Sequence, residues 1–229
     1  MNSKENLALG LVNYMRTNRV STTEFADAMG KKGSLVGVSP LTPNHFKVGI
    51  IRHIQVIGGS NYELHKQLEE SLPEEVIFVE PIDFGPEAVF GDLVARFSLL
   101  YKSASAIVVS GNIRDVNRLR KEGYPIWAIG SNPVGAINSK VDSQHLPETS
   151  LSGGIAVCDD GGVVICPPEL VTEELFTAVK FIELQEDIWY YCLNTLKWST
   201  FDIVCKKRYL TEIDELPNHF LKALEIDPN

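Results

Sequence analysis

The chain has 229 residues, of which 44% are hydrophobic and 22% charged, as in an ordinary globular protein with one substantial core. Its formal net charge of -9 and its pI of about 5.1 argue against the overall positive field that nucleic-acid binders use for sequence-independent affinity. We therefore expect no direct contact with DNA or RNA.

The cysteines and the amino terminus indicate the compartment. The four cysteines are too widely spaced for a zinc knuckle or a redox Cys-x-x-C pair, so we interpret them as reduced thiols of a cytoplasmic protein: Cys158, Cys166, Cys192 and Cys205. The first six residues are polar, and no apolar run approaches membrane-spanning length. The sequence therefore predicts neither secretion nor membrane insertion.

Hydrophobic residues change between helical and strand spacing along most of the chain. Ser21-Thr22-Thr23-Glu24 has the pattern of a capping box at a helix start. In chain order, the sequence predicts helices at about 7–15 and 22–30, a strand at 46–57, a helix at 61–68, strands at 76–79 and 106–109 separated by a helix at 92–101, a helix after 115, a strand at 124–129, a hairpin of 155–158 with 163–166, and a long helix from about 169. This alternation favours an α/β sheet.

Two segments carry no regular pattern. Prolines and glycines interrupt residues 130–151, which are expected to form a loop that serves as a flap or a subunit contact. Beyond Trp198 the chain becomes a mixed tail. We accordingly predict one domain over residues 1–195 and a carboxyl-terminal extension of unknown role over residues 196–229.

The most informative stretch runs from Ala106 to Asp115, where an apolar strand passes through a glycine turn into adjacent opposite charges. Arg114 offers a planar fork suited to a carboxylate, and Asp115 offers hard oxygen atoms suited to Mg²⁺ or Mn²⁺. Ligands of α/β proteins tend to bind at the carboxyl ends of strands. The pair could therefore hold a small oxo acid, although an ordinary helix cap and a chance Arg-Asp pair explain the same residues.

Two further segments could line such a site. Gly91-Asp92-Leu93-Val94 lies where a loop enters a helix, so its backbone N–H groups could receive an anion, or it could be a tight turn with an ordinary first-turn acid. Asn61, after two glycines and a serine, could point into a cleft or simply cap a helix.

Other charged residues have simpler interpretations. Asp159-Asp160 could be a metal pair, but their place in a hairpin turn favours solvated turn residues. Lys206-Lys207-Arg208 is too short for a nucleic-acid patch and is typical of a solvated face.

Taken in order, these segments resemble the family that contains the 4-hydroxy-4-methyl-2-oxoglutarate aldolases and the regulator of ribonuclease activity A, the RraA-like family. The resemblance spans roughly residues 5–190 and rests mainly on a Gly-Asp-x-x-Ala followed by a Gly-x-x-Arg-Asp. The matching segments are Ser21–Thr23 with Asp27-Ala28, Asn61 with Leu64–Lys66, Glu75–Val79, Gly91–Ala95, Val108–Asp115, Gly123–Ala128 with Pro133, and the hairpin from Ile155 through Pro167.

The resemblance implies an α-β-β-α sandwich of the RraA-like type, assembled as a homotrimer or a hexamer with active sites at subunit interfaces. It implies a divalent-metal lyase that cleaves a 4-hydroxy-2-oxo acid to release pyruvate or decarboxylates oxaloacetate. Asp115 would be the ligand to Mg²⁺ or Mn²⁺, and Arg114 would hold the oxo acid and stabilise the enolate. Carried over in the same way, the amides of Gly91, Asp92, Leu93 and Val94 would receive the substrate carboxylate, Asp92 would orient a water, Asn61 would line the pocket, and Glu183 or Glu186 of a neighbouring subunit would assist.

Two functional hypotheses follow from this resemblance. The first is a metal-dependent lyase acting on a small 2-oxo acid such as 4-hydroxy-4-methyl-2-oxoglutarate or oxaloacetate. The second is a non-catalytic regulator that binds ribonuclease E, because the family includes regulators that retain both motifs. The metal ligand and the anion-binding backbone together favour the first.

Overall fold

The computed structural model describes residues 3–141 and 150–224, and the chain divides into two compact units, 1–173 and 174–229. The sequence-based boundary lies later, at residue 195. The difference arises because the long helix α6 (Glu173–Asn194) contributes Ile188 and Cys192 to the apolar cluster of the second unit.

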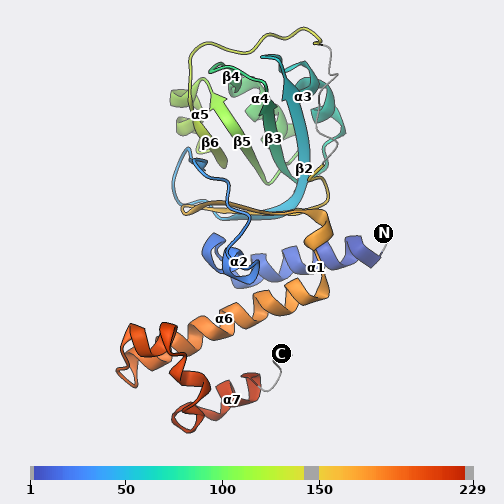
Figure 1. Ribbon diagram of the computed structural model, residues 1–229. Helices are drawn as coiled ribbons and strands as arrows, with labels where there is room; N and C mark the ends of the chain where they lie inside the picture. The colour runs from blue at the N-terminus through green and yellow to red at the C-terminus, as the bar shows by residue number, and fades with distance from the viewer. Residues whose placement is uncertain (1–2, 142–149, 225–229) are drawn as a thin grey trace. The chain divides into compact units, whose positions relative to one another are not determined.

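The first unit alternates strands and helices as expected, and Figure 1 shows the arrangement. Its elements are α1 (Ser3–Asn18), α2 (Thr22–Ala28), β1 (Ser39–Pro40), β2 (Lys47–Ile57), α3 (Tyr62–Gln67), β3 (Val76–Ile82), β4 (Ala88–Phe90), α4 (Asp92–Arg96), β5 (Ala106–Ile113), α5 (Val116–Glu122), β6 (Ile126–Ser131), β7 (Ile155–Asp159) and β8 (Gly162–Cys166). The α/β class predicted from the sequence is confirmed.

The eight strands form one sheet in the order β1-β6-β5-β3-β2-β7-β8, with β4 added beside β5. Strand β2 serves both halves of the sheet. Its residues 47–50 pair antiparallel with β7, and its residues 51–57 pair parallel with β3. Residues 33–35 hydrogen-bond to β8 before β1 pairs with β6, so this short segment nearly closes the sheet.

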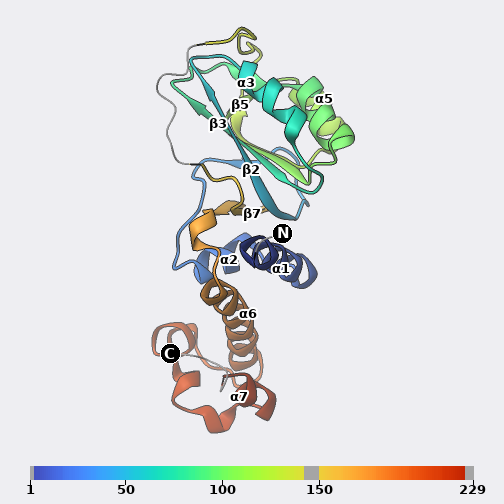
Figure 2. The same ribbon diagram turned by 90° about the vertical axis from the view of Figure 1, so that its right-hand side faces the viewer.

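Each face of the parallel strands belongs to a different apolar cluster. Helices α3 and α5 lie on one face, as Figure 2 shows, and the residues between the helices and the sheet include Ile54, Val79, Val109 and Leu119. The other face packs against the β7–β8 hairpin around Trp127, which is fully buried. Strands buried on both faces read as continuous apolar runs, which explains the sequence of β5.

Several local predictions are confirmed. Ser21 accepts a hydrogen bond from the Glu24 amide while the Glu24 side chain accepts one from the Ser21 amide, which completes the capping box of α2. Strands β7 and β8 form the expected antiparallel hairpin.

The end of β5 differs from the prediction. The strand does not turn at Ser110-Gly111-Asn112 but continues to Ile113, with a register irregularity between Val109 and Asn112 against β6. The chain turns instead at Asp115, whose φ of 58° is left-handed. Because residues 110–112 are of turn type, the last half of β5 was not predicted. The short strand β4, which pairs with that half, was not predicted either.

Other boundaries also differ. Helix α4 covers only Asp92–Arg96 and continues as a π-helix over Phe97–Tyr101. A 3-10 turn at Pro168–Leu170 precedes α6, which therefore starts at Glu173 instead of Glu169. Part of the loop expected at 130–151 lies outside the described residues.

The acidic pair of the hairpin turn is more engaged than solvated turn residues would be. Asp159 accepts hydrogen bonds from the amide and the hydroxyl of Thr22, over 2.8 and 2.7 Å, at the first turn of α2. Asp160 accepts from the amide of Asn44. The pair therefore fixes two distant segments to the hairpin by backbone and hydroxyl donors.

The second unit has an apolar cluster of its own. Tyr209 and Ile203 are buried in it together with residues of α6 and α7 (Asn218–Leu224). The guanidinium of Arg208 lies 4.2 Å from the Trp198 ring and 2.6 Å from the Glu212 carboxylate. Arg208 is therefore part of this packing and not only a solvated charge.

All four cysteines are free, and three of them are buried. Among the residues that the structure describes, no helix has both the length and the apolar character needed to span a bilayer.

Candidate active site

A cavity of about 580 Å³ opens where β5 ends and where α4 and α5 begin. Both helices follow a strand end, so their first turns face the same opening. The cavity is lined by Asp92, Leu93, Ile113, Arg114, Asp115, Val116, Asn117, Arg118, Ser131, Asn132 and Pro133. The structure thus brings together the Gly91 and Arg114 motifs, which are more than 20 residues apart in the sequence.

The turn that carries Arg114 and Asp115 is held by β4. The Arg114 amide donates to the Phe90 carbonyl over 2.9 Å. Asp115 is the N-cap of α5 in a left-handed conformation, which aspartate adopts more readily than most residues. This conformation turns the chain directly from the strand into the helix and leaves the two charged side chains at the cavity.

Asp115 is linked to the start of α4 by a hydrogen bond. Its Oδ2 accepts from the Asp92 amide over 3.1 Å. A Cβ on Gly91 would lie 2.2 Å from the same oxygen, so glycine at this position lets the Asp115 carboxylate stay where it is. In the structure the Asp92 amide is therefore engaged by Asp115, whereas the resemblance implied that it receives the substrate carboxylate.

The Asp92 side chain is nearly buried, with 13% of its surface exposed. Arg118 Nε lies 3.2 Å from its Oδ2, and Arg96 Nε lies 3.7 Å from its Oδ1. Oδ1 is buried and makes no hydrogen bond in the structure. A buried carboxylate oxygen without a donor is a position where a water or a ligand hydroxyl would be stabilised.

Arg96 and Arg118 were not among the predicted site residues. A usable signal was present for Arg96, since it lies four residues after Asp92, the spacing of neighbours on one helix face. The signal is weak, because such pairs are common on exposed helices. Only the meeting of α4 with α5 shows that both arginines face one carboxylate.

Arg114 is half-exposed, and its Nε lies 3.8 Å from Asp115 Oδ2. The segment 132–137 runs beside it and is hydrogen-bonded to β4, with the Ala88 amide donating to Val134 O and the Ala136 amide donating to Ala88 O. A Cβ on Gly135 would lie 2.5 Å from Arg114 Nη1. The backbone of this segment therefore forms one wall against the guanidinium.

Three residues predicted to contact substrate lie outside the cavity lining, namely Asn61, Gly91 and Val94. Asn61 is buried, and its Nδ2 donates to the Val89 carbonyl over 3.0 Å. Its Oδ1 is buried without a hydrogen-bond partner in the structure. Val94 is buried in the apolar cluster beneath the helix. Asn61 and Val94 therefore stabilise the elements beside the cavity and do not line it.

The side chains at the cavity suit a metal ion that binds one protein carboxylate and several waters. Within residues 3–141 and 150–224, no three His, Cys, Asp or Glu side chains are grouped so that they could hold a metal ion together. Asp115 supplies one carboxylate, with 45% of its side chain exposed toward the cavity. Mg²⁺ commonly keeps several waters and binds one or two carboxylates, so this arrangement fits Mg²⁺ or Mn²⁺ and not a zinc site with nitrogen and sulfur ligands.

Comparison with known sequences finds two similar proteins, one of which is named as an aldolase. The chain is 28% identical over 156 residues to a protein of Halalkalibacterium halodurans named "Putative 4-hydroxy-4-methyl-2-oxoglutarate aldolase", a match that covers 65% of this chain and 73% of that protein. It is also 26% identical over 181 residues to Protein DlpA of Legionella pneumophila, but that match covers only 28% of DlpA.

Solved structures share the fold. An uncharacterized protein from Pseudomonas syringae superposes with a TM-score of 0.69 at 20% identity, covering 87% of this chain and 94% of that one. Streptomyces coelicolor RraAS2, described as an unusual member of the RNase ES inhibitor RraA family, gives a TM-score of 0.62 at 27% identity, covering 78% and 94%. The sequence model of the RraA-like family, described as Aldolase/RraA, matches residues 22–165, which is more than half of the chain. The chain belongs to the RraA-like family.

Proposed function

We propose that this protein is a divalent-metal-dependent lyase that cleaves or decarboxylates a small 2-oxo acid and releases pyruvate. The observation that carries the proposal is the meeting of Arg114, Asp115 and the nearly buried carboxylate of Asp92 at one cavity. The relative named as an aldolase supports the same reaction class.

The reaction requires negative charge to develop on the ketone oxygen as the carbon–carbon bond breaks. Arg114 binds the oxo acid and places its guanidinium beside that oxygen, where a positioned cation lowers the barrier. Asp115 would hold Mg²⁺ or Mn²⁺ together with waters, and the metal would polarise the same carbonyl. The 4-hydroxyl proton leaves as this bond breaks, and a proton returns to the enolate carbon to form pyruvate.

Asp92 has the geometry of a residue that holds the water involved in this proton transfer. Arg96 and Arg118 keep its carboxylate in place, and Oδ1 remains without a hydrogen bond. We assign the water to Oδ1, which lies 3.7 Å from Arg96 Nε and belongs to a residue that lines the cavity. The proposal therefore gives Asp92 a proton-handling role and Arg114 a charge-stabilising role.

The test is a coupled assay of pyruvate release on a panel of oxo acids, with and without added Mg²⁺ or Mn²⁺. Arg114→Ala is expected to lower kcat by about 10²–10³, the usual cost of removing one charge-stabilising donor. Asp115→Asn is expected to abolish the pyruvate release that depends on added metal. Lys121 on α5 and Asp214 in the second unit are both exposed and provide control substitutions that remove a charge. Lys121→Ala and Asp214→Asn should leave turnover unchanged.

A second candidate is a regulator that binds ribonuclease E, which the 27% identity to RraAS2 favours. This candidate predicts no turnover with any oxo acid and a direct complex with purified ribonuclease E. The complex should survive Arg114→Ala and Asp115→Asn, because these side chains lie in a cavity instead of on a broad surface. Metal-dependent pyruvate release that both substitutions abolish would decide for the lyase.

We also propose that the chain acts as a homotrimer or hexamer, with the acid from a neighbouring subunit supplied by Glu183 or Glu186 on α6. Light scattering of the purified protein measures the assembly. Separate Glu183→Gln and Glu186→Gln variants in the pyruvate assay test the acid: the one that assists should lower kcat without changing the molar mass.

A further inference from the structure

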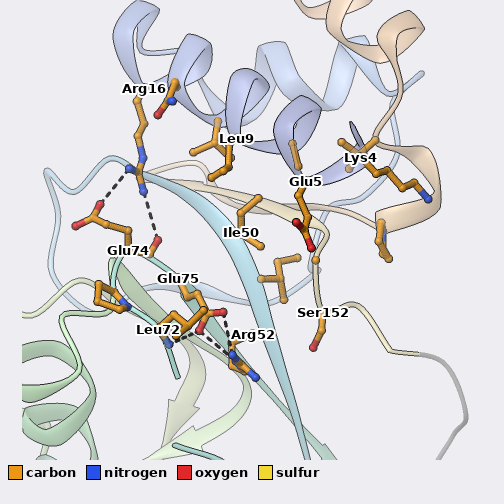
Figure 3. Close-up of a pocket in the computed structure, with 18 residues that line it drawn as sticks. Lys4, Glu5, Leu9, Arg16, Ile50, Arg52, Leu72, Glu74, Glu75 and Ser152 are labelled. Atoms are coloured by element: carbon orange, nitrogen blue, oxygen red, sulfur yellow. Dashed lines mark hydrogen bonds and ion pairs between the residues drawn. The ribbon is translucent and has the colours of Figure 1, made fainter. Parts of the chain in front are cut away.

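A second and larger cavity, of about 700 Å³, lies in the first unit between helix α1 and the start of β2, and Figure 3 shows it. It shares no lining residue with the candidate active site. The two cavities also lie at opposite ends of the parallel strands, because residues 72–75 of this cavity precede β3 whereas Arg114 follows β5.

The middle of the cavity is apolar. Leu9 of α1 lies across from Ile50 of β2 and from Leu72, which precedes β3, and Val12 of α1 also lines the cavity. Leu9 and Leu72 remain 38% and 58% exposed at its edge. Apolar side chains that face a cavity and stay in contact with water gain from an apolar occupant.

One end of the cavity is closed by Arg16. Its Nε donates to the Val48 carbonyl over 2.8 Å. Its Nη1 lies 3.0 Å from the Glu74 carboxylate, as Figure 3 shows for the pair. Because Arg16 and Glu74 neutralise each other, this end presents no free charge. An occupant would place its apolar part toward this end.

The other end has hydrogen-bond donors in excess. Glu75 is fully used, since it accepts from Arg52 Nε, Arg52 Nη2 and the Leu72 amide over 3.1, 3.2 and 2.7 Å. Arg52 Nη1 makes no hydrogen bond to the described part of the chain. Glu5, the remaining acid at this end, has an interaction of its own.

We propose that this cavity binds an amphipathic carboxylate, with its hydrocarbon between α1 and β2 and its carboxylate at Arg52. An arginine that already holds Glu75 through Nε and Nη2 offers the two N–H groups of Nη1 to a second acceptor. A cationic head group would find no free acceptor there, because Glu74 and Glu75 are both paired. Cavities of roughly 300–1,000 Å³ commonly hold small ligands, so the volume is suitable.

The test is isothermal titration calorimetry of the full chain with octanoate and, separately, with 1-octanol, which has the same hydrocarbon but no charge. Octanoate is expected to bind at least tenfold more tightly than 1-octanol. Leu72→Asp, which adds a negative charge at the exposed apolar edge, is expected to weaken octanoate binding at least tenfold. Leu100→Asp is the matched control, since Leu100 is 57% exposed on a helix elsewhere in the unit, and it should bind octanoate normally.

Arg52→Lys is a second variant, which keeps a cation beside Glu75 but removes Nη1, with Arg16→Lys as its control at the end that pairs with Glu74. Arg52→Lys should lose most of the preference for octanoate over 1-octanol, and Arg16→Lys should keep it. Absence of octanoate binding, equal binding of the two ligands by the unaltered protein, or equal losses in Leu72→Asp and Leu100→Asp would overturn the proposal.

Discussion

The backbone amide of Asp92 donates to the Asp115 carboxylate over 3.1 Å, which joins the helix after β4 to the turn after β5. The bond fixes the distance between the two acidic residues of the candidate site. It also means that a change in the backbone at either motif moves the other.

Gly91→Ala should damage catalysis far more than folding. The new Cβ would lie 2.2 Å from Asp115 Oδ2, so the carboxylate must shift, while the Gly91 φ of -141° suits alanine without strain. Misplacing a reacting group by about 1 Å can cost about 10² in rate, so we expect a loss of that size in pyruvate release with Tm almost unchanged.

A double-mutant cycle isolates the cause of this loss. If Gly91→Ala acts by displacing Asp115, then combining it with Asp115→Asn should be no worse than Asp115→Asn alone. Losses that multiply in the double variant would show that Gly91 acts elsewhere.

Gly135→Ala should raise KM more than it lowers kcat. Its Cβ would lie 2.5 Å from Arg114 Nη1 and 3.2 Å from Cζ, so the guanidinium would have to give way. The end of a flexible side chain can move at modest cost, and we expect a rise in KM of about tenfold, which corresponds to about 1.4 kcal/mol. Steady-state kinetics on the oxo acid that the protein turns over measures this, and an unchanged KM would contradict the role given to the 132–137 segment.

His53 should make the protein less stable in mild acid. Burial lowers the pKa of His53, although its hydrogen bond to Glu80, 3.0 Å long, opposes the shift. The unfolded chain, with a histidine pKa near 6.5, therefore binds a proton before the folded protein does, so the free energy of unfolding should fall as pH decreases below about 6.5.

Urea denaturation at pH 7.5 and pH 5.5 measures this effect. His53→Gln keeps a donor for Glu80 and an acceptor for the Leu151 amide, which donates to His53 Nδ1 over 3.1 Å, but it cannot take up a proton. The variant should lose part of the difference between the two pH values. His65→Gln, at an exposed position on α3, should retain the whole difference.

Only one of the four thiols should react quickly with a disulfide reagent. Cys205 is exposed, whereas burial raises the pKa of Cys158 and Cys192 and raises the pKa of Cys166 to about 12. The thiolate is the reactive form, so these three should react only after unfolding. Titration with Ellman's reagent should give one fast thiol in the native protein and none in Cys205→Ser.

Much of the fold could be predicted from the sequence because its signals are local. Apolar runs bounded by glycine and proline predicted β2, β3 and β6, and the capping box at Ser21–Glu24 predicted the start of α2. The extension of β5 through Ser110–Asn112 could not be predicted in this way, since residues of turn type form a strand there only because β4 and β6 pair beside them.

The sequence by itself determined the family and the residue types that carry the proposed chemistry, because the spacing of Gly-Asp and Arg-Asp is written in the chain. Only the tertiary structure decided which groups meet. It engages the Asp92 amide with Asp115, directs Arg96 and Arg118 onto Asp92, and buries Asn61 beneath β4. Such contacts join residues on separate elements, and they depend on how the helices pack at the sheet edge, which no local pattern specifies.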